Sequence, residues 1–194
     1  ISGVILYLVL LSSGTNDVYL VIFHTISAST TTGFAFAKIG EFTNSAKLLI
    51  MFLMFIGGMS FSTAGGIKII RLIVALKTVG WTIKRTSLPP EVVLPLRIGG
   101  RTLVDRDLIL VFVLFFLGFI SIFLSTFVFS LFGYSLMDSA FEVTSAFSLG
   151  GLSVGIVSLS LPSILKLILI LQMIIGRTEI IPFLVLLRGR WGKR

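Results

Sequence analysis

Two short stretches of small and hydroxylated residues, 118 positions apart, carry oxygen atoms in a pattern suited to cation binding. The first runs from Ser27 to Phe34 and includes Gly33. The second runs from Ser145 to Leu152 and includes Gly151. Backbone carbonyls and threonine hydroxyls are weak dipoles that replace the hydration shell of an alkali cation and still let it leave. Each stretch is therefore a candidate ion path, and the likeness between them indicates two copies of one repeat.

The candidate ligands occupy five consecutive positions in each copy. They are Thr30, Thr31, Thr32, Gly33 and Phe34 in the first copy and Ser148, Leu149, Gly150, Gly151 and Leu152 in the second. Glycine permits backbone angles closed to other residues, so neighbouring carbonyls can turn toward one axis. The second copy lacks the threonine run, and we expect it to bind through carbonyls alone. An ordinary loop with a glycine turn remains open for the first copy alone, but the repetition favours an ion path.

Each candidate segment follows an apolar stretch too short to cross a bilayer. Val18 to Ala28, with Asp17 as a plausible helix cap, would form a helix about 16 Å long, roughly half of the hydrocarbon core. Leu136 to Phe147 supplies a second short helix. A helix that stops inside the membrane leaves polar backbone groups that must be buried in protein or line a wet cavity. We therefore predict two re-entrant pore helices, each adding partial negative charge at its C-terminus.

The composition places the chain in a membrane. It has 194 residues, a mean hydropathy of +1.11 and only 12% charged residues, well below the roughly 25% of soluble domains. The absence of cysteine excludes a disulfide framework and a thiolate metal site. The apolar run at residues 1–11 is too short to span the membrane, so we expect this sequence to be a fragment whose missing part completes that helix.

The net charge of +8 raises the possibility of a nucleic-acid partner, but the position of the basic residues argues for topology. Ten of the sixteen lie between Lys77 and Arg106 or in the last seven residues, and both groups flank apolar spans. The positive-inside rule then places residues 82–106 and the C-terminus in the cytoplasm. We expect a multi-pass protein of the cell membrane, in contact with lipid, that binds no nucleic acid.

The segment from Lys47 to Trp81 is too long for one spanning helix, at about 52 Å if continuous. Ten positions within it hold four glycines and three hydroxyl groups, and glycine disfavours helix by up to about 1 kcal/mol relative to alanine. We predict an intramembrane loop beneath Thr30 to Phe34 that can obstruct the path. A small-residue helix-packing face is the alternative. The loop candidates are Gly57, Gly58, Ser60, Ser62, Thr63, Gly65 and Gly66.

Few other residues carry recognisable chemistry. Asp138 and Glu142 lie four apart on one helix face, and we interpret them as an attraction for cations at an outer mouth, or as solvated side chains, rather than an acid–base pair. Arg177 and Glu179, in a predicted final span from Pro162 to Arg188, each need a partner of their own. We expect Arg177 to face the ion path and Glu179 to be structural. His24 receives no role, and no residue is assigned a catalytic function.

These blocks, in this order, resemble the Trk/Ktr/HKT superfamily of potassium transporters, in particular the C-terminal half of a TrkH/KtrB-type subunit. The matching segments are residues 30–34, the glycine-rich loop at 55–68, residues 145–155 and the sequence Ile175-Gly176-Arg177-Thr178-Glu179. Together they extend over nearly the whole chain.

The resemblance implies an all-α integral membrane fold of two tandem helix–pore-helix–helix repeats, which are half of a four-repeat pore. The domains would be residues 1–85 for the third unit, 86–106 for a cytoplasmic connection and 107–194 for the fourth unit. Gly33 and Gly151 would be selectivity-filter glycines, residues 57–66 the gating loop, and Arg177 a charge near the permeation path. Potassium would bind at Thr31, Thr32, Gly33, Gly150 and Gly151.

The implied function is potassium uptake through a channel-like pore, without a covalent cofactor and without a catalysed chemical step. Family members are typically dimers that bind a cytosolic RCK-type nucleotide-binding regulatory subunit, which would suit the basic cytoplasmic face. The alternative is a non-conducting half-subunit or scaffold that completes a pore only with other chains.

Overall fold

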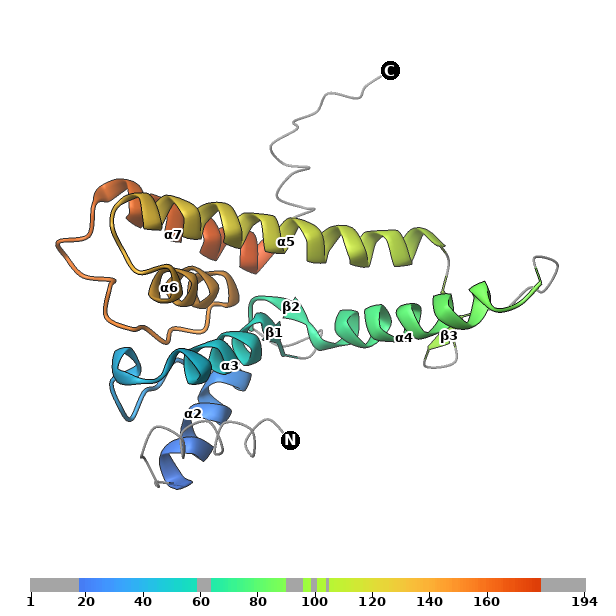
Figure 1. Ribbon diagram of the computed structural model, residues 1–194, viewed down its shortest axis with the longest axis horizontal. Coiled ribbons are helices and arrows are strands. Elements are labelled where there is room, and N and C mark those ends of the chain that lie inside the picture. The colour runs from blue at the N-terminus through green and yellow to red at the C-terminus, as the bar shows by residue number, and fades with distance from the viewer. Residues whose placement is uncertain (1–17, 59–63, 90–95, 99–100, 104, 179–194) are drawn as a thin grey trace, which may run out of the picture.

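The computed structural model describes residues 18–58, 64–89, 96–98, 101–103 and 105–178. This part of the chain is mostly helical (Figure 1). Its first half contains α2 (Val18–Thr30), the 3-10 turn η1 (Ile39–Glu41), α3 (Asn44–Phe55), β1 (Ile56–Gly57), β2 (Ile67–Lys68) and α4 (Ile69–Thr86). Its second half contains β3 (Arg97–Ile98), β4 (Arg101–Thr102), α5 (Asp105–Leu131), α6 (Leu136–Ser148) and α7 (Ser163–Thr178).

The lengths of the helices agree closely with those expected from the sequence. The two short helices α2 and α6 begin at the predicted residues and end two residues and one residue later than predicted. The segment Asp107–Leu131 of α5 is the one described helix that is long and apolar enough to cross a membrane. The final helix α7 is described only as far as Thr178, so Glu179 and the rest of the predicted span lie outside the described residues.

The long segment after Thr43 is broken, as its glycines predict. The side chain of Thr43 caps α3 by accepting a hydrogen bond from the Ala46 N–H, and the helix ends at Phe55. The chain resumes as α4 only at Ile69, so a continuous helix with a small-residue packing face is wrong here. Between the two helices β1 and β2 pair in parallel. An all-α fold is therefore correct except for β1, β2 and the antiparallel pair β3 and β4.

The helix α6 lies between α5 and α7 on one side and α3 on the other (Figure 1), and it contacts all three. One core cluster joins Phe141 of α6 to Val21 of α2 and to Ile50 of α3. Another joins Val143 of α6 to Phe129 of α5 and Leu165 of α7. Because α6 is covered on several sides by apolar side chains, the segment that follows it starts from a fixed position.

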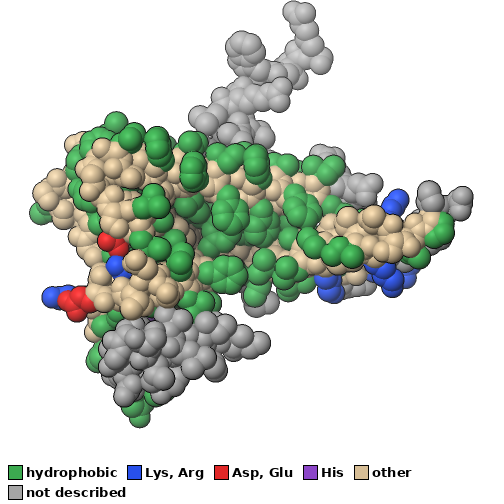
Figure 2. All heavy atoms as spheres, viewed as in Figure 1, with side chains coloured by type: hydrophobic (Ala, Val, Ile, Leu, Met, Phe, Trp, Pro, Cys, Tyr) green, Lys and Arg blue, Asp and Glu red, His purple; other side chains and the backbone are tan. Residues whose placement is uncertain are grey.

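Hydrophobic side chains cover much of the middle of the visible face, and most of the visible lysine and arginine side chains lie toward one end (Figure 2). Hydrophobic side chains cover the visible face of α5, as expected for a helix surrounded by lipid. Lysine and arginine gather toward the end of α4, where Lys77, Lys84 and Arg85 are exposed. The apolar and charged parts are thus separated along the molecule.

Candidate functional site

The two candidate ion-binding segments meet at their glycines. A Cβ atom added to Gly33 would lie 2.9 Å from the Gly150 carbonyl oxygen and 3.1 Å from the Gly151 Cα atom. A Cβ atom added to Gly151 would in turn lie 3.2 Å from the Gly33 Cα atom. The backbones therefore touch at a point where no side chain fits between them.

The two segments also have similar φ angles at two pairs of positions related by the 118-residue offset. Thr31 and Leu149, which correspond at that offset, have φ values of 54° and 55°. The corresponding glycines, Gly33 and Gly151, have φ values of 81° and 70°. Positive φ is strained for residues with a side chain, so its recurrence at both positions is a specific similarity.

Matching hydrogen bonds close the C-terminal ends of α2 and α6. The Thr32 N–H donates to the Ser27 carbonyl over 3.1 Å, and the Gly150 N–H donates to the Ser145 carbonyl over 2.8 Å. Both α2 and α6 thus direct their C-terminal ends, which carry partial negative charge, toward the segment that follows. The arrangement favours a cation beside these segments.

Side-chain oxygens are distributed unequally between the two segments. In the first, the hydroxyl of Thr30 donates to the Ile26 carbonyl over 2.6 Å, and Thr32 is exposed. In the second, Ser148 is fully buried and its hydroxyl donates to the Ser145 carbonyl, while Leu152 is only 1% exposed. The oxygens that the second segment has available for a ligand are therefore backbone carbonyls around Leu149 to Gly151.

The predicted gating loop lies against the second segment at Gly65. A Cβ atom on Gly65 would lie 2.7 Å from the Ser148 carbonyl oxygen, while Gly57 packs directly against the Gly65 carbonyl oxygen. This close backbone approach explains the glycines at positions 57 and 65, and the expected position beneath Thr30 to Phe34 stays a prediction. The ammonium of Lys68 donates to the Ala64 carbonyl over 2.5 Å. The predicted loop residues Ser60, Ser62 and Thr63 lie outside the described residues.

The last turn of α7 packs closely against the C-terminal end of α6. Gly176 packs directly on the Phe147 carbonyl, one residue before Ser148, so the interface admits no side chain there. Arg177, the next residue, is exposed. Arg177, which we expect to face the ion path, is therefore next in the chain to the contact between Gly176 and Phe147. This contact lies just before Ser148, where the second segment begins.

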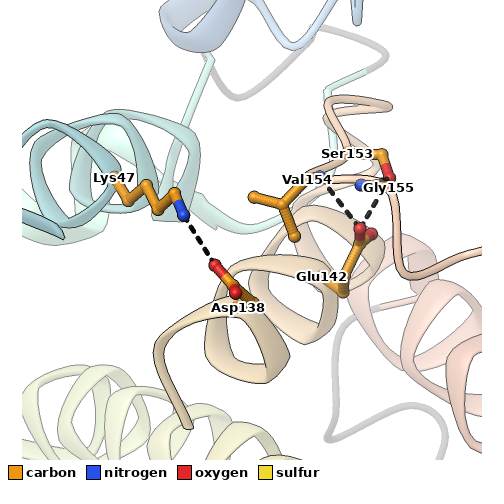
Figure 3. A network of polar contacts seen from close by, with 6 residues as sticks. All are labelled: Lys47, Asp138, Glu142, Ser153, Val154 and Gly155. Carbon is orange, nitrogen blue, oxygen red and sulfur yellow. Dashed lines mark hydrogen bonds and ion pairs between the residues drawn. The ribbon is translucent and has the colours of Figure 1, made fainter. Parts of the chain in front are cut away.

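Glu142 is buried and Asp138 is paired with a lysine, so the interpretation of both as solvated side chains is wrong for Glu142. The Lys47 ammonium on α3 lies 2.7 Å from the Asp138 carboxylate (Figure 3). Glu142 is 3% exposed, and its carboxylate accepts hydrogen bonds from the Ser153 hydroxyl over 2.5 Å and the Val154 N–H over 2.9 Å (Figure 3). Because an ionisable residue inside a membrane requires a partner, the sequence alone could have predicted that Asp138 and Glu142 are paired.

His24 is a titratable side chain in α2. It is fully buried, its Nδ1 atom lies 2.8 Å from the Leu20 carbonyl oxygen, and its ring meets Phe42 edge to face. Among the described residues no group of three or more His, Asp or Glu side chains is placed to hold a metal ion.

Comparison with known proteins gives consistent results. The family model for TrkH, a cation transport protein, matches residues 10–190. An uncharacterized cation transporter of Methanocaldococcus jannaschii is 41% identical over 165 residues, which are 85% of this chain and 35% of that protein. The Trk system potassium uptake protein TrkH of Vibrio parahaemolyticus is 32% identical over 176 residues, 86% of this chain and 35% of that protein.

The structural similarity extends over almost the entire chain. The crystal structure of the potassium transporter TrkH from Vibrio parahaemolyticus matches with a TM-score of 0.82 and 26% sequence identity, covering 98% of this chain and 42% of that chain. This chain therefore spans about a third of the length of the curated relatives named above. The sequence and structure together show that it belongs to the TrkH family of cation transport proteins.

Proposed function

We propose that the full-length protein containing this chain takes up potassium ions through a channel-like pore. The observation that carries this proposal is the contact between Gly33 and Gly151, because it joins the ends of two half-membrane helices through segments of one backbone conformation. Curated relatives with this family's sequence are potassium uptake proteins, which supports potassium as the ion.

In this proposal the ion binds where the two segments meet. Thr31, Thr32 and Gly33 provide one part of the coordination, and Gly150 and Gly151 provide another through their carbonyls. The helix ends of α2 and α6 add partial negative charge without a carboxylate that would hold the ion too strongly. Selectivity then comes from replacement of the hydration shell, and no covalent chemistry is required.

The pore itself requires more chain than is present here. We propose that residues 1–85 and 107–194 are the third and fourth of four helix–pore-helix–helix units, connected by cytoplasmic residues 86–106. The greater length of the curated relatives supports this arrangement, since about two thirds of each lies beyond the match. A filter formed by four units would surround the ion on all sides.

Control of the pore is assigned to the loop at residues 57–66. Gly65 contacts the Ser148 carbonyl, so a movement of the loop would displace the first residue of the second filter segment. Arg177 follows the Gly176 contact on the same helix end, and its positive charge would raise the barrier to a cation if it faces the path. The loop and Arg177 would therefore both act near the start of the second filter segment, at Phe147 and Ser148.

Assembly is proposed from the resemblance and the distribution of charge. The exposed basic residues Lys77, Lys84 and Arg85 on α4 would face the cytoplasm, where an RCK-type nucleotide-binding regulatory subunit could bind. The protein would be a homodimer in the cell membrane, surrounded by lipid.

The test is potassium and rubidium uptake by a transport-deficient cell that expresses the full-length open reading frame. Wild type is compared with Gly33→Ser and with a variant whose loop at residues 57–66 is shortened. Loss of potassium preference in the first variant and leakage in the second support a filter and a gate. Background uptake by wild-type protein that is present in the membrane would instead favour a non-conducting half-subunit or scaffold.

A further inference from the structure

The buried carboxylate of Glu142 has no place in the ion path described above, yet it is held by a specific set of donors. It lies in the second turn of α6, and it accepts hydrogen bonds from Ser153 and Val154, which belong to the segment directly after the second filter (Figure 3). The Gly155 N–H donates in turn to the Ser153 hydroxyl oxygen over 3.0 Å. One side chain therefore connects the body of the pore helix to three consecutive residues.

The hydrogen bonds of Glu142 hold the residues that directly follow the second filter segment. Because α6 is packed against α3, α5 and α7, its side chains are anchored. Leu152, which precedes the tethered residues, is buried in the core cluster that also contains Val21 and Ile50. The carbonyls around Gly151 are thus held between a buried leucine on one side and the Glu142 acceptor on the other.

The first filter segment is held by a different hydrogen bond. At the 118-residue offset, Glu142 corresponds to His24, whose Nδ1 atom pairs with the Leu20 carbonyl within its own helix. The bond that closes this copy is instead donated by the Ser27 hydroxyl to the Phe34 carbonyl over 2.7 Å. The two copies therefore differ in the side chain that holds the filter segment. A serine hydroxyl holds the first segment, and the Glu142 carboxylate holds the second.

The tethered segment also supports the outer loop of the first unit. A Cβ atom on Gly40 of η1 would lie 2.7 Å from the Val154 carbonyl oxygen, so the two backbones are in direct contact. Since the N–H of Val154 is bonded to Glu142, a change at Glu142 alters a residue that touches both units. This contact extends the influence of the carboxylate beyond its own filter.

We infer that Glu142 is a positioning residue for ion selection: as a hydrogen-bond acceptor, it holds residues 153–155 so that the carbonyls around Gly151 keep the geometry that discriminates between alkali cations. The inference rests on the proposed function of these segments as a filter. It is specific about the chemistry, because the acceptor oxygen is required and the negative charge is not. Glutamine supplies such an oxygen at the same position, and leucine supplies none.

The functional test uses the full-length protein reconstituted in lipid vesicles, with the ratio of rubidium to sodium uptake as the readout. We expect Glu142→Leu to lower this ratio by about fivefold or more, the effect of one lost hydrogen bond to a charged group. Glu142→Gln should keep the ratio within about twofold of wild type, the scale of a weakened acceptor. The matched control is Gln172→Leu, because Gln172 is equally buried at 3% exposure and hydrogen-bonded, but lies between α7 and α5. That variant should lose stability and keep the ratio.

A second measurement needs no transport. Hydrogen–deuterium exchange of the peptide containing Val154 should be faster in Glu142→Leu than in wild type and unchanged in Glu142→Gln. If wild type conducts but Glu142→Leu keeps its uptake ratio, the inference is overturned while the proposed function stands. If wild type conducts nothing, the proposed function fails, and the exchange data alone decide whether Glu142 holds the segment. Unchanged exchange in Glu142→Leu overturns the inference in either case.

Discussion

The Lys47 ammonium lies 2.7 Å from the Asp138 carboxylate, although the two residues are separated by 91 positions in the chain. The pair joins the first turn of α3 to the first turn of α6, and thereby connects the inner helix of one predicted unit to the pore helix of the other. Lys47 is buried, with 6% of its side chain exposed, whereas 30% of the Asp138 side chain is exposed. The contact is consequently partly shielded from water.

Removing one member of this pair should destabilise the protein. In Lys47→Met the Asp138 carboxylate loses its counter-charge, and we expect the free energy of unfolding to fall by about 3 kcal/mol. The double variant Lys47→Met with Asp138→Leu should recover most of that loss, because apolar residues can replace a buried ion pair. Thermal unfolding of the full-length protein in detergent measures both effects.

An exposed ion pair supplies the control for this prediction. Lys38 and Glu41 approach to 3.9 Å, but their side chains are 86% and 76% exposed. Lys38→Met should therefore leave the unfolding temperature almost unchanged. An equal loss in Lys38→Met and Lys47→Met would show that burial of the Asp138 pair has no special effect.

The contact between Gly33 and Gly151 predicts an effect on ion preference that is separate from backbone strain. Gly33→Ala adds a methyl group about 3 Å from backbone atoms of the second segment, at a φ of 81°. Gly133→Ala imposes similar strain, at a φ of 87°, but has no atom within 4 Å of the new methyl group. Each substitution should cost about 1 kcal/mol or more of stability.

Only Gly33→Ala should also change the relative uptake of rubidium and sodium, since its methyl group displaces the carbonyl of Gly150. The two variants are compared in vesicles at equal protein content. A shift of similar size in Gly133→Ala would mean that the effect arises from general strain and not from contact between the segments.

The close packing of α7 on α6 predicts that Gly176 tolerates no side chain. In Gly176→Ala the methyl group would overlap the Phe147 carbonyl, so α7 must move away. We expect a loss of about 1 to 3 kcal/mol in unfolding free energy together with reduced uptake. Gly80→Ala on α4 has no neighbour within 4 Å of its methyl group and should be neutral, or stabilising by up to about 1 kcal/mol. Equal melting temperatures for the two variants would contradict this account.

Buried hydrogen bonds between α5 and α7 predict measurable coupling within the membrane. The Gln172 amide donates to the Ser125 hydroxyl over 2.6 Å and to the Ser121 carbonyl over 3.0 Å. We expect the double-mutant cycle of Gln172→Leu and Ser125→Ala to give a coupling energy of about 0.6 to 2 kcal/mol. Unfolding of the four proteins in detergent measures it, and strictly additive losses would show that this bond contributes no net stability.

The sequence by itself determined the features that depend on local composition. The apolar stretches before Thr30 and Ser148 are too short to span a membrane as helices, and the glycines from Gly57 to Gly66 disfavoured a continuous helix. The repeat of Ser27 and Ser145 identified two equivalent segments. The starts of the two short helices and the break after Phe55 were predicted correctly, because chain length, hydropathy and glycine density act over a few residues.

The tertiary structure decided which of these segments touch and which charges pair. Nothing in the spacing of Gly33 and Gly151 specifies that their backbones meet, and nothing near Asp138 or Glu142 in the chain reveals Lys47 as a partner of one and Val154 as a partner of the other. Such contacts depend on the packing of α6 against α3, α5 and α7. The physical reason is that a buried charge in a membrane must find a partner, but the partner is selected by the fold and not by the neighbouring sequence.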